Sequence, residues 1–175
     1  GLDNLDSIVD NAFGILIDRG DLGAETKISN IPLMQKRIIN TANKYGKPVI
    51  VATEMLHTMI DNPFPTKSEV NDIANAVLDG ASALMLSGET AVGEYPFAAC
   101  KLMQDVAMVT EEHLSENKAW DFELKSSTSD VVAQCINLAS ANLEITKILA
   151  VTYSGFSARM ISLHRPKQDI FVVTD

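Results

Sequence analysis

Several residue types are scarce in this chain of 175 residues, and each scarcity excludes a class of protein. Two cysteines, Cys100 and Cys135, are too few for a disulfide framework or a thiolate zinc site. Both lie in apolar helical patterns, which predicts buried core thiols. Lysine and arginine number 14 against 23 acidic residues, so the net charge of -9 disfavours binding to phosphate backbones. The sequence therefore predicts no nucleic-acid partner.

Long hydrophobic runs are also missing. No stretch approaches the ~20 apolar residues of a membrane span. Residues 1–6 lack the basic region and hydrophobic core of a signal peptide, and Gly1 in place of methionine indicates that this end need not be natural. Hydrophobic residues make up 46% and charged residues 21%, as in ordinary globular proteins. We therefore expect a soluble, cytoplasmic protein with no membrane partner.

The first organising pattern is a recurrence of short apolar runs at residues 14–17, 48–52 and 83–86, whose starts lie about 34 residues apart. Runs that are apolar throughout predict strands buried on both faces of a parallel sheet. The segments between them read as helices. Asn30 is the expected cap of one, the Thr66–Glu69 spacing predicts a capping box for the next, and Pro96 begins a third. This alternation predicts an α/β fold.

The polar stretch after residue 115 predicts a domain junction. We expect residues 1–116 to form one domain, residues 117–128 the junction, and residues 129–175 part of a second α/β domain. In that second part, a helix over 131–141 is expected to precede a strand over 147–152. A short helix ending at His164 and a strand over 170–173 complete the predicted unit.

Polar side chains follow each apolar run, where parallel strands end and helix N-termini leave backbone N–H groups unpaired. The three segments are Asp18–Gly23, Thr53–Met55 and Ser87–Thr90. The N–H groups beside Asp21 could hold a carboxylate or phosphate, and the Asp21 side chain could offer oxygen to a cation such as Mg²⁺. The alternative is that Arg19, Gly20 and Asp21 form only a salt-bridged turn.

At this point the chain resembles the pyruvate kinase family. Several stretches match the family in order and spacing over residues 1–114, and the match continues less tightly to the end. The residues that carry the resemblance are Arg19–Gly23, Gly46–Ile50, Ala52–Leu56, Asn62–Pro63, Pro65–Thr66, Asp72–Gly80, Met85–Ala91 and Tyr95–Pro96.

The resemblance implies an incomplete (β/α)8 barrel, of which this chain holds the last three βα units, followed by the first part of a C-terminal regulatory α/β domain. The family transfers a phosphoryl group from phosphoenolpyruvate to ADP in glycolysis, giving pyruvate and ATP, with Mg²⁺ (or Mn²⁺) and K⁺. The resemblance also implies a homotetramer in the full-length protein.

Family motif positions assign roles to individual residues. Asp21 would ligate the divalent cation, and the N–H groups of Gly20 and Asp21 would bind the substrate carboxylate. Thr53 would contact substrate beside the reacting enolate, and Ser87 would support it nearby. These roles are chemically sound, because a hydroxyl near an enol carbon can relay or order a proton.

Two residues depart from the family pattern: Asp18 stands where a small or cyclic residue is usual, and Glu54 where glutamine is common. One interpretation is that Asp18 pairs with Arg19, and Glu54 with a cation. The other is altered metal preference or weakened activity, since added carboxylates attract a metal while repelling phosphates.

A second family feature lies in the last segment, where residues 152–157 resemble an effector loop that binds the phosphate of an allosteric regulator. The expected phosphate ligands are Thr152, Ser154, Gly155 and Ser157. A capped strand-to-helix turn is the alternative. Tyr153 and Phe156 replace basic or small residues of some members, which weakens the phosphate prediction.

The resemblance places the catalytic lysine and the nucleotide-binding residues before residue 1. We therefore expect the isolated chain to be inactive, although the family is enzymatic. The alternative is a non-catalytic binding or assembly module derived from pyruvate kinase. The presence of Asp21, Thr53 and Ser87 favours a segment of an enzyme, because such a module has no need of active-site residues.

Overall fold

The computed structural model of the chain describes residues 1–117 and 127–174. These residues divide into two compact units, Gly1–Lys118 and Ala119–Asp175, and each is described by itself. Most of the expected junction, residues 118–126, lies outside the described residues.

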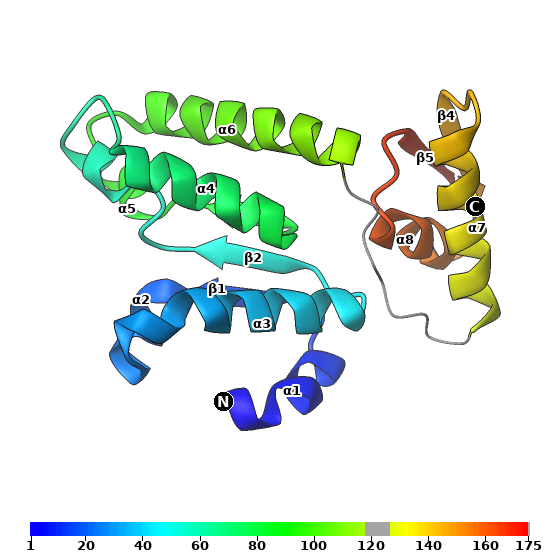
Figure 1. The fold of residues 1–175 in the computed structure, drawn as a ribbon, viewed down its shortest axis with the longest axis horizontal. Helices are drawn as coiled ribbons and strands as arrows, with labels where there is room; N and C mark the ends of the chain where they lie inside the picture. The colour runs from blue at the N-terminus through cyan, green and yellow to red at the C-terminus, as the bar shows by residue number, and fades with distance from the viewer. Residues whose placement is uncertain (118–126, 175) are drawn as a thin grey trace. The chain divides into compact units, whose positions relative to one another are not determined.

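The first unit is built on a parallel three-stranded sheet with the order β1-β2-β3, of which Figure 1 labels β1 and β2. Its strands are β1 (Ile15–Asp18), β2 (Val49–Ala52) and β3 (Ala83–Met85). Asp18 lies opposite Ala52, and Ala52 lies opposite Met85. Because the strands are parallel and end in register, the loops that follow all three begin at one edge of the sheet.

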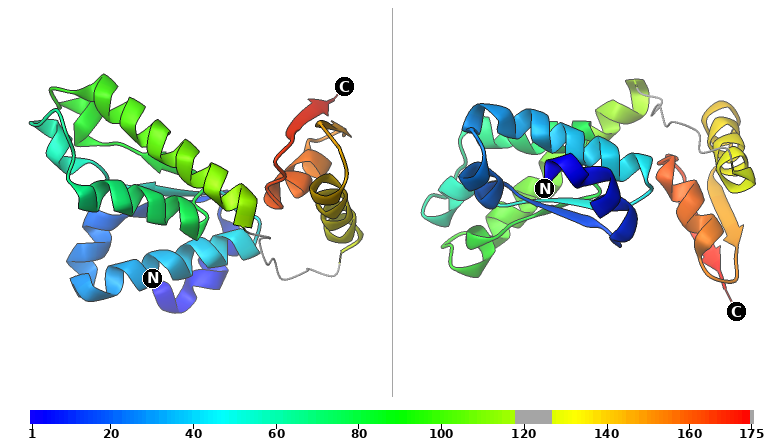
Figure 2. Two further views of the ribbon diagram at one scale, coloured as in Figure 1. Left: turned by 45° about the horizontal axis from the view of Figure 1, so that its top comes forward. Right: turned by 90° about the horizontal axis from the view of Figure 1, so that it is seen from below.

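Helices connect these strands, and α4 and α6 lie side by side in both Figure 1 and Figure 2. The helical elements of the first unit are η1 (Leu2–Asn4), α1 (Leu5–Asn11), α2 (Arg19–Glu25), η2 (Ile28–Asn30), α3 (Ile31–Lys44), η3 (His57–Ile60), α4 (Lys67–Asp79), α5 (Gly88–Ala91) and α6 (Pro96–Asn117).

The helix ends follow local chemistry to different degrees. The predicted capping box is confirmed at α4, where Thr66 and Glu69 each bond the other's backbone N–H, and Gly80 ends the helix at φ 96°. The start of α3 agrees with expectation only in part, because Pro32 lies in the first turn but the Asn30 side chain makes no capping hydrogen bond. Proline suits this turn, where its missing N–H would have no partner.

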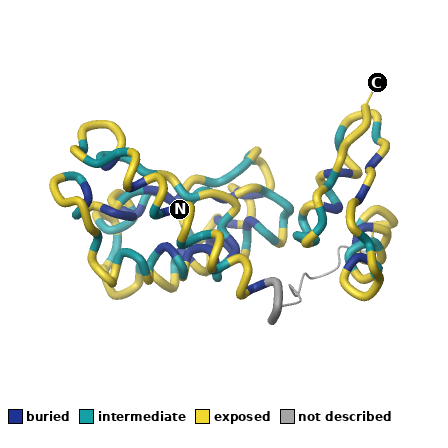
Figure 3. The backbone as a smooth tube through the Cα atoms, turned by 90° about the horizontal axis from the view of Figure 1, so that it is seen from above, coloured by how far each residue is buried: buried dark blue, intermediate teal, exposed yellow. Residues whose placement is uncertain are grey.

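The hydrophobic core of the first unit lies on one face of the sheet, where Ile17, Val49 and Val51 are buried with residues of α3 and α4. Figure 3 shows how buried stretches, in dark blue, alternate with exposed ones along the backbone. The prediction that the strands are buried on both faces is wrong for this chain, since Leu16 on β1 is 50% exposed. Side chains alternate between the faces of a strand, and the helices cover only one of them.

The second unit pairs two parallel strands, β4 (Lys147–Val151) and β5 (Asp169–Val173), with two helices, α7 (Thr128–Asn142) and α8 (Phe156–Leu163). Its small core gathers apolar residues from α7, β4 and α8, namely Ala133, Ile148, Ala150, Ala158 and Ile161. Ser127 caps α7, its hydroxyl accepting from the Asp130 N–H at 3.2 Å. This unit thus has the strand–helix–strand order expected from the sequence.

The cysteines differ from expectation. Cys100 on α6 and Cys135 on α7 are both exposed rather than buried. On α7, the buried Ala133 marks the core-facing side, and Cys135, two residues on, projects about 200° away from it. Within the described residues, no helix is long and apolar enough to cross a membrane.

Candidate active site

The predicted site residues of the first unit lie in the three loops at the C-terminal edge of the sheet. Gly20 and Asp21 lie in the first turn of α2, directly after β1. Thr53 follows β2, and Ser87 is the N-cap residue of α5 after β3. The strand register therefore brings the starts of these three loops to one edge, although the residues are about thirty positions apart in sequence.

The loop after β2 begins with a strained turn, which we call the Thr53 turn (residues 53–56). Thr53 and Glu54 have φ of 66° and 53°, in the left-handed region that β-branched residues such as threonine rarely adopt. The Thr53 carbonyl accepts from the Arg19 guanidinium, at 3.1 Å to Nε and 2.7 Å to Nη2. Met55 and Leu56 are fully buried. A strained turn persists only when surrounding contacts determine its conformation, and Arg19 supplies two of them.

Arg19 is itself buried, and it pairs with Asp72 on α4 through Nη1. The prediction that Asp18 pairs with Arg19 is therefore wrong. The Arg19 side chain runs from the start of α2 toward β2 and α4, where the Thr53 carbonyl and the Asp72 carboxylate both accept from it. A planar guanidinium can bond the Thr53 carbonyl and the Asp72 carboxylate at the same time, although Asp72 lies much further from Arg19 in sequence than Asp18 does.

Asp18 instead caps α2. Its Oδ1 accepts from the N–H of Asp21 at 3.1 Å and lies 3.2 Å from the Thr53 hydroxyl. The Thr53 hydroxyl in turn accepts from the N–H groups of Arg19 and Gly20, at 2.9 and 3.1 Å. The N–H groups predicted to bind a substrate carboxylate are thus bonded to groups of the chain itself.

Asp21 is exposed, and its carboxylate is a hard oxygen donor of the kind Mg²⁺ prefers. Within residues 1–117 and 127–174, no three His, Cys, Asp or Glu side chains gather as a metal-binding group. Asp21 fits a divalent cation in chemistry and exposure, and it would be one ligand among several.

Glu89 has a structural role that the sequence did not predict. It is only 2% exposed, and its two carboxylate oxygens accept from the N–H groups of Leu56 and Ser87, each at 2.9 Å. Glu89 therefore ties the Thr53 turn to the loop after β3. Its position two residues after Ser87, inside a matched family stretch, was the available signal.

Glu69 holds the later part of the loop between β2 and α4. Its carboxylate accepts from the N–H groups of Thr58 and Thr66, at 2.8 and 2.7 Å, and from both their hydroxyls. Burial alone would raise the pKa of Glu69, but these hydrogen bonds to the ionised form outweigh it and lower the pKa. The start of α4 is thereby joined to η3.

The predicted effector residues lie in the second unit, in what we call the 152–157 loop, between β4 and α8. Gly155 adopts φ 76° as the N-cap residue of α8, with no side-chain capping bond. The Thr152 N–H donates to the Val173 carbonyl at 3.0 Å, so Thr152 still pairs beside β5. Arg159, one turn into α8, lies 5.8 Å from the ring centroid of Phe156 and adds a positive charge near the loop that was not among the predicted site residues.

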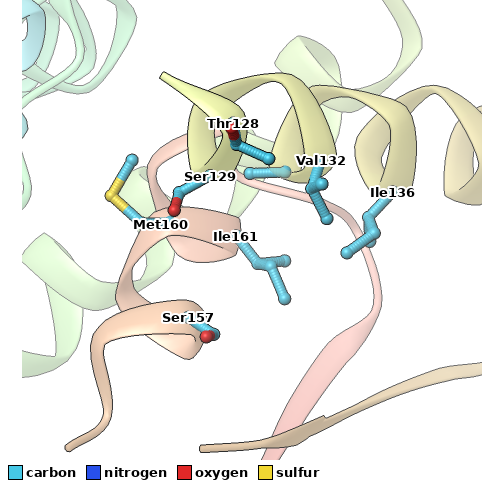
Figure 4. A pocket seen from close by; sticks show the side chains of 8 residues that line it. Thr128, Ser129, Val132, Ile136, Ser157, Met160 and Ile161 are labelled. Atoms are coloured by element: carbon cyan, nitrogen blue, oxygen red, sulfur yellow. The ribbon is translucent and has the colours of Figure 1, made fainter.

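Ser157 also lines a groove of about 170 Å³ between α7 and α8 (Figure 4). Its hydroxyl shares the groove with those of Thr128 and Ser129, and the rest of the lining is apolar. In the same unit, burial lowers the pKa of His164, and the Asp130 carboxylate opposes this shift.

Comparison with known proteins decides the family. A family model described as "Pyruvate kinase, barrel domain" matches residues 1–100. The chain belongs to the pyruvate kinase family. It is 44% identical to the pyruvate kinases of Bacillus licheniformis and Clostridium acetobutylicum, in each case over 99% of this chain. It covers 30% and 37% of those relatives, about a third of their length.

The fold is shared as well. A pyruvate kinase from Cryptosporidium parvum superposes with a TM-score of 0.89 at 36% identity, over 99% of this chain and 37% of that one. The predicted resemblance to pyruvate kinase is confirmed, and so is the α/β fold with parallel strands, consistent with an incomplete barrel. The exposed Leu16 fits such a segment, because the strands of a complete pyruvate kinase barrel together fill its interior.

Proposed function

We propose that this chain supplies the phosphoenolpyruvate end of a pyruvate kinase active site. The reaction would transfer a phosphoryl group from phosphoenolpyruvate to ADP, giving pyruvate and ATP. The observation that carries the proposal is the meeting of Asp21, Thr53 and Ser87 at the C-terminal edge of one parallel sheet. Active sites of barrels form at this edge.

Each residue has a role suited to its chemistry. The N–H groups of Gly20 and Asp21 would bind the substrate carboxylate once their present acceptors release them. The Thr53 hydroxyl would lie beside the enolate and order a proton at its carbon, with Ser87 as polar support. The Asp21 carboxylate would hold Mg²⁺ or Mn²⁺, and a bound cation stabilises negative charge developing on the transferred group. K⁺ would be held by residues outside this chain.

The units divide the proposed work. The first unit would be the last part of the catalytic barrel, and the second the beginning of the regulatory domain. In the 152–157 loop, the hydroxyls of Thr152, Ser154 and Ser157 would bind an effector phosphate beside Gly155. Arg159 supports this proposal, because a guanidinium matches phosphate geometry. The full-length protein would be a cytoplasmic homotetramer.

The test is a hybrid enzyme in which this chain replaces the matching third of the Bacillus licheniformis pyruvate kinase. We expect the hybrid to form pyruvate from phosphoenolpyruvate and ADP with Mg²⁺ and K⁺, and the isolated chain to form none. In the hybrid, Asp21→Asn should lower kcat about a hundredfold or more. The control Asp3→Asn makes the same change at an exposed residue of η1 and should leave the rate unaltered.

A folded hybrid that forms no pyruvate would contradict the proposal and favour the binding or assembly module.

A further inference from the structure

The Thr53 hydroxyl has no hydrogen-bonding capacity left. A hydroxyl offers one proton and two lone pairs. Both lone pairs are used by the N–H groups of Arg19 and Gly20. Its proton is shared between the Ala52 carbonyl at 2.7 Å and the Asp18 carboxylate at 3.2 Å. A substrate that needs this hydroxyl must therefore displace one of these partners.

The Asp18 carboxylate occupies the other group assigned to substrate, the Asp21 N–H. Its Oδ1 accepts from the Asp21 N–H, so the same oxygen lies against both the amide and the hydroxyl assigned to substrate. Phosphoenolpyruvate carries a carboxylate of the same chemistry, together with a phosphate that Asp18 repels. The cost of displacing an internal acceptor and the cost of approaching its charge both oppose substrate binding.

We propose that Asp18 is an internal carboxylate that competes with the substrate carboxylate for the Asp21 N–H and the Thr53 hydroxyl and so weakens substrate binding. This inference rests on the proposed function, because that function assigns the Asp21 N–H and Thr53 to substrate. The small or cyclic residue that the family usually carries at this position offers no such competitor.

Two other roles for Asp18 predict different outcomes. If it served only to cap α2, its loss would loosen the site, whereas asparagine would preserve the cap, since Asn and Asp cap equally well. If Asp18 were a second cation ligand beside Asp21, removing it would raise the Mg²⁺ concentration that activity requires. Competition alone predicts tighter substrate binding when the side chain is removed.

The experiment compares Asp18→Ala, Asp18→Asn and the control Asp3→Asn in the hybrid enzyme. We expect Asp18→Ala to lower the KM for phosphoenolpyruvate about tenfold with little change in kcat. Asp18→Asn keeps an acceptor for the Asp21 N–H but loses the charge, so its KM should fall between those of the wild type and the alanine variant. Circular dichroism checks that each variant is folded.

A KM for folded Asp18→Ala equal to or above the wild-type value would overturn the proposal. So would a raised Mg²⁺ requirement in both Asp18 variants. If the hybrid with the native segment forms no pyruvate, the proposed function fails separately, and a second measurement on the 175-residue chain decides the competition. At equal concentrations of sodium oxalate, the amide resonances of Gly20 and Asp21 should shift more in Asp18→Ala than in wild type. Equal shifts in the two proteins would overturn the proposal that Asp18 competes with a bound carboxylate.

Discussion

The Thr53 turn and the 152–157 loop both follow a parallel strand and both contain left-handed residues, yet they are held in different ways. Three side chains distant in sequence, from Asp18, Arg19 and Glu89, bond the hydroxyl, carbonyl and amide groups of the Thr53 turn. The 152–157 loop relies on a glycine at φ 76° and on backbone bonds of Thr152 and Gly155.

The difference indicates what each loop can do. A turn held by hydrogen bonds to three side chains keeps one geometry, which suits a site that must orient a reacting substrate. A loop whose hydroxyls are uncommitted to capping α8 can rearrange around a ligand. Single substitutions should therefore disturb the first loop strongly and the second weakly.

The largest effect is expected from Glu89→Ala. It leaves the N–H groups of Leu56 and Ser87 without their acceptor, and an unsatisfied buried donor costs about 1–3 kcal/mol. We expect the free energy of unfolding of the first unit to fall by about 3 kcal/mol, measured by urea denaturation. Glu111→Ala, on an exposed face of α6, should change it by less than about 0.5 kcal/mol. A similar loss of stability in both variants would contradict the claim that the hydrogen bonds of Glu89 stabilise the Thr53 turn.

A smaller loss is expected from Arg19→Lys, which keeps the charge but not the planar fork. An ammonium cannot reproduce both bonds to the Thr53 carbonyl and the ion pair with Asp72. We expect a loss of about 2 kcal/mol and faster amide exchange at Met55. Unchanged exchange there would show that the strained turn is held without Arg19.

In the second unit, Gly155→Ala should cost about 1 kcal/mol, because alanine resists the left-handed conformation at φ 76°. Ser154→Ala, its neighbour in the same loop, should change stability by less than about 0.5 kcal/mol, since the exposed Ser154 side chain does not cap α8. A larger cost for Ser154→Ala than for Gly155→Ala would contradict the view that backbone conformation sets this loop.

The smallest effect expected is a pH dependence confined to the second unit. Burial lowers the pKa of His164 from its ordinary 6.5, so the folded state resists a proton that the unfolded state accepts. The stability contribution is complete above pH 6.5 and declines as the pH falls below it. His164→Gln should flatten this decline in urea titrations, whereas His57→Gln, at an exposed position, should not. An equal decline in both variants would contradict the claim that His164 causes this pH dependence.

The sequence predicted those parts of the structure that depend on local patterns. The strands, the capping box of Thr66 and Glu69, and the family itself follow from short stretches read alone. One local prediction also failed, because the Asn30 side chain does not cap α3. The other failures involve groups distant in sequence. Arg19 pairs with Asp72, 53 positions away, rather than with the adjacent Asp18. Cys100 and Cys135 are exposed, contrary to prediction. An apolar helical pattern does not show which side chains of a helix contact neighbouring elements, and few elements pack around these helices.

The site shows the same division. The positions of Asp21, Thr53 and Ser87 after their strands could be predicted, because parallel strands end at one edge. The role of Glu89 could not, since its place in a matched family stretch marks it only as a candidate and does not show that its carboxylate reaches both Leu56 and Ser87. The consumption of the Thr53 hydroxyl by four partners likewise emerges only from the folded arrangement.

The most direct test of the central claim is the rate of pyruvate formation by the hybrid enzyme, measured with Asp21 intact and with Asp21→Asn. We expect turnover in the first and a loss of about a hundredfold or more in the second, with Asp3→Asn unaffected. Equal rates for the intact and Asp21→Asn hybrids, in folded protein, would contradict the assignment of this sheet edge as the phosphoenolpyruvate end of the active site.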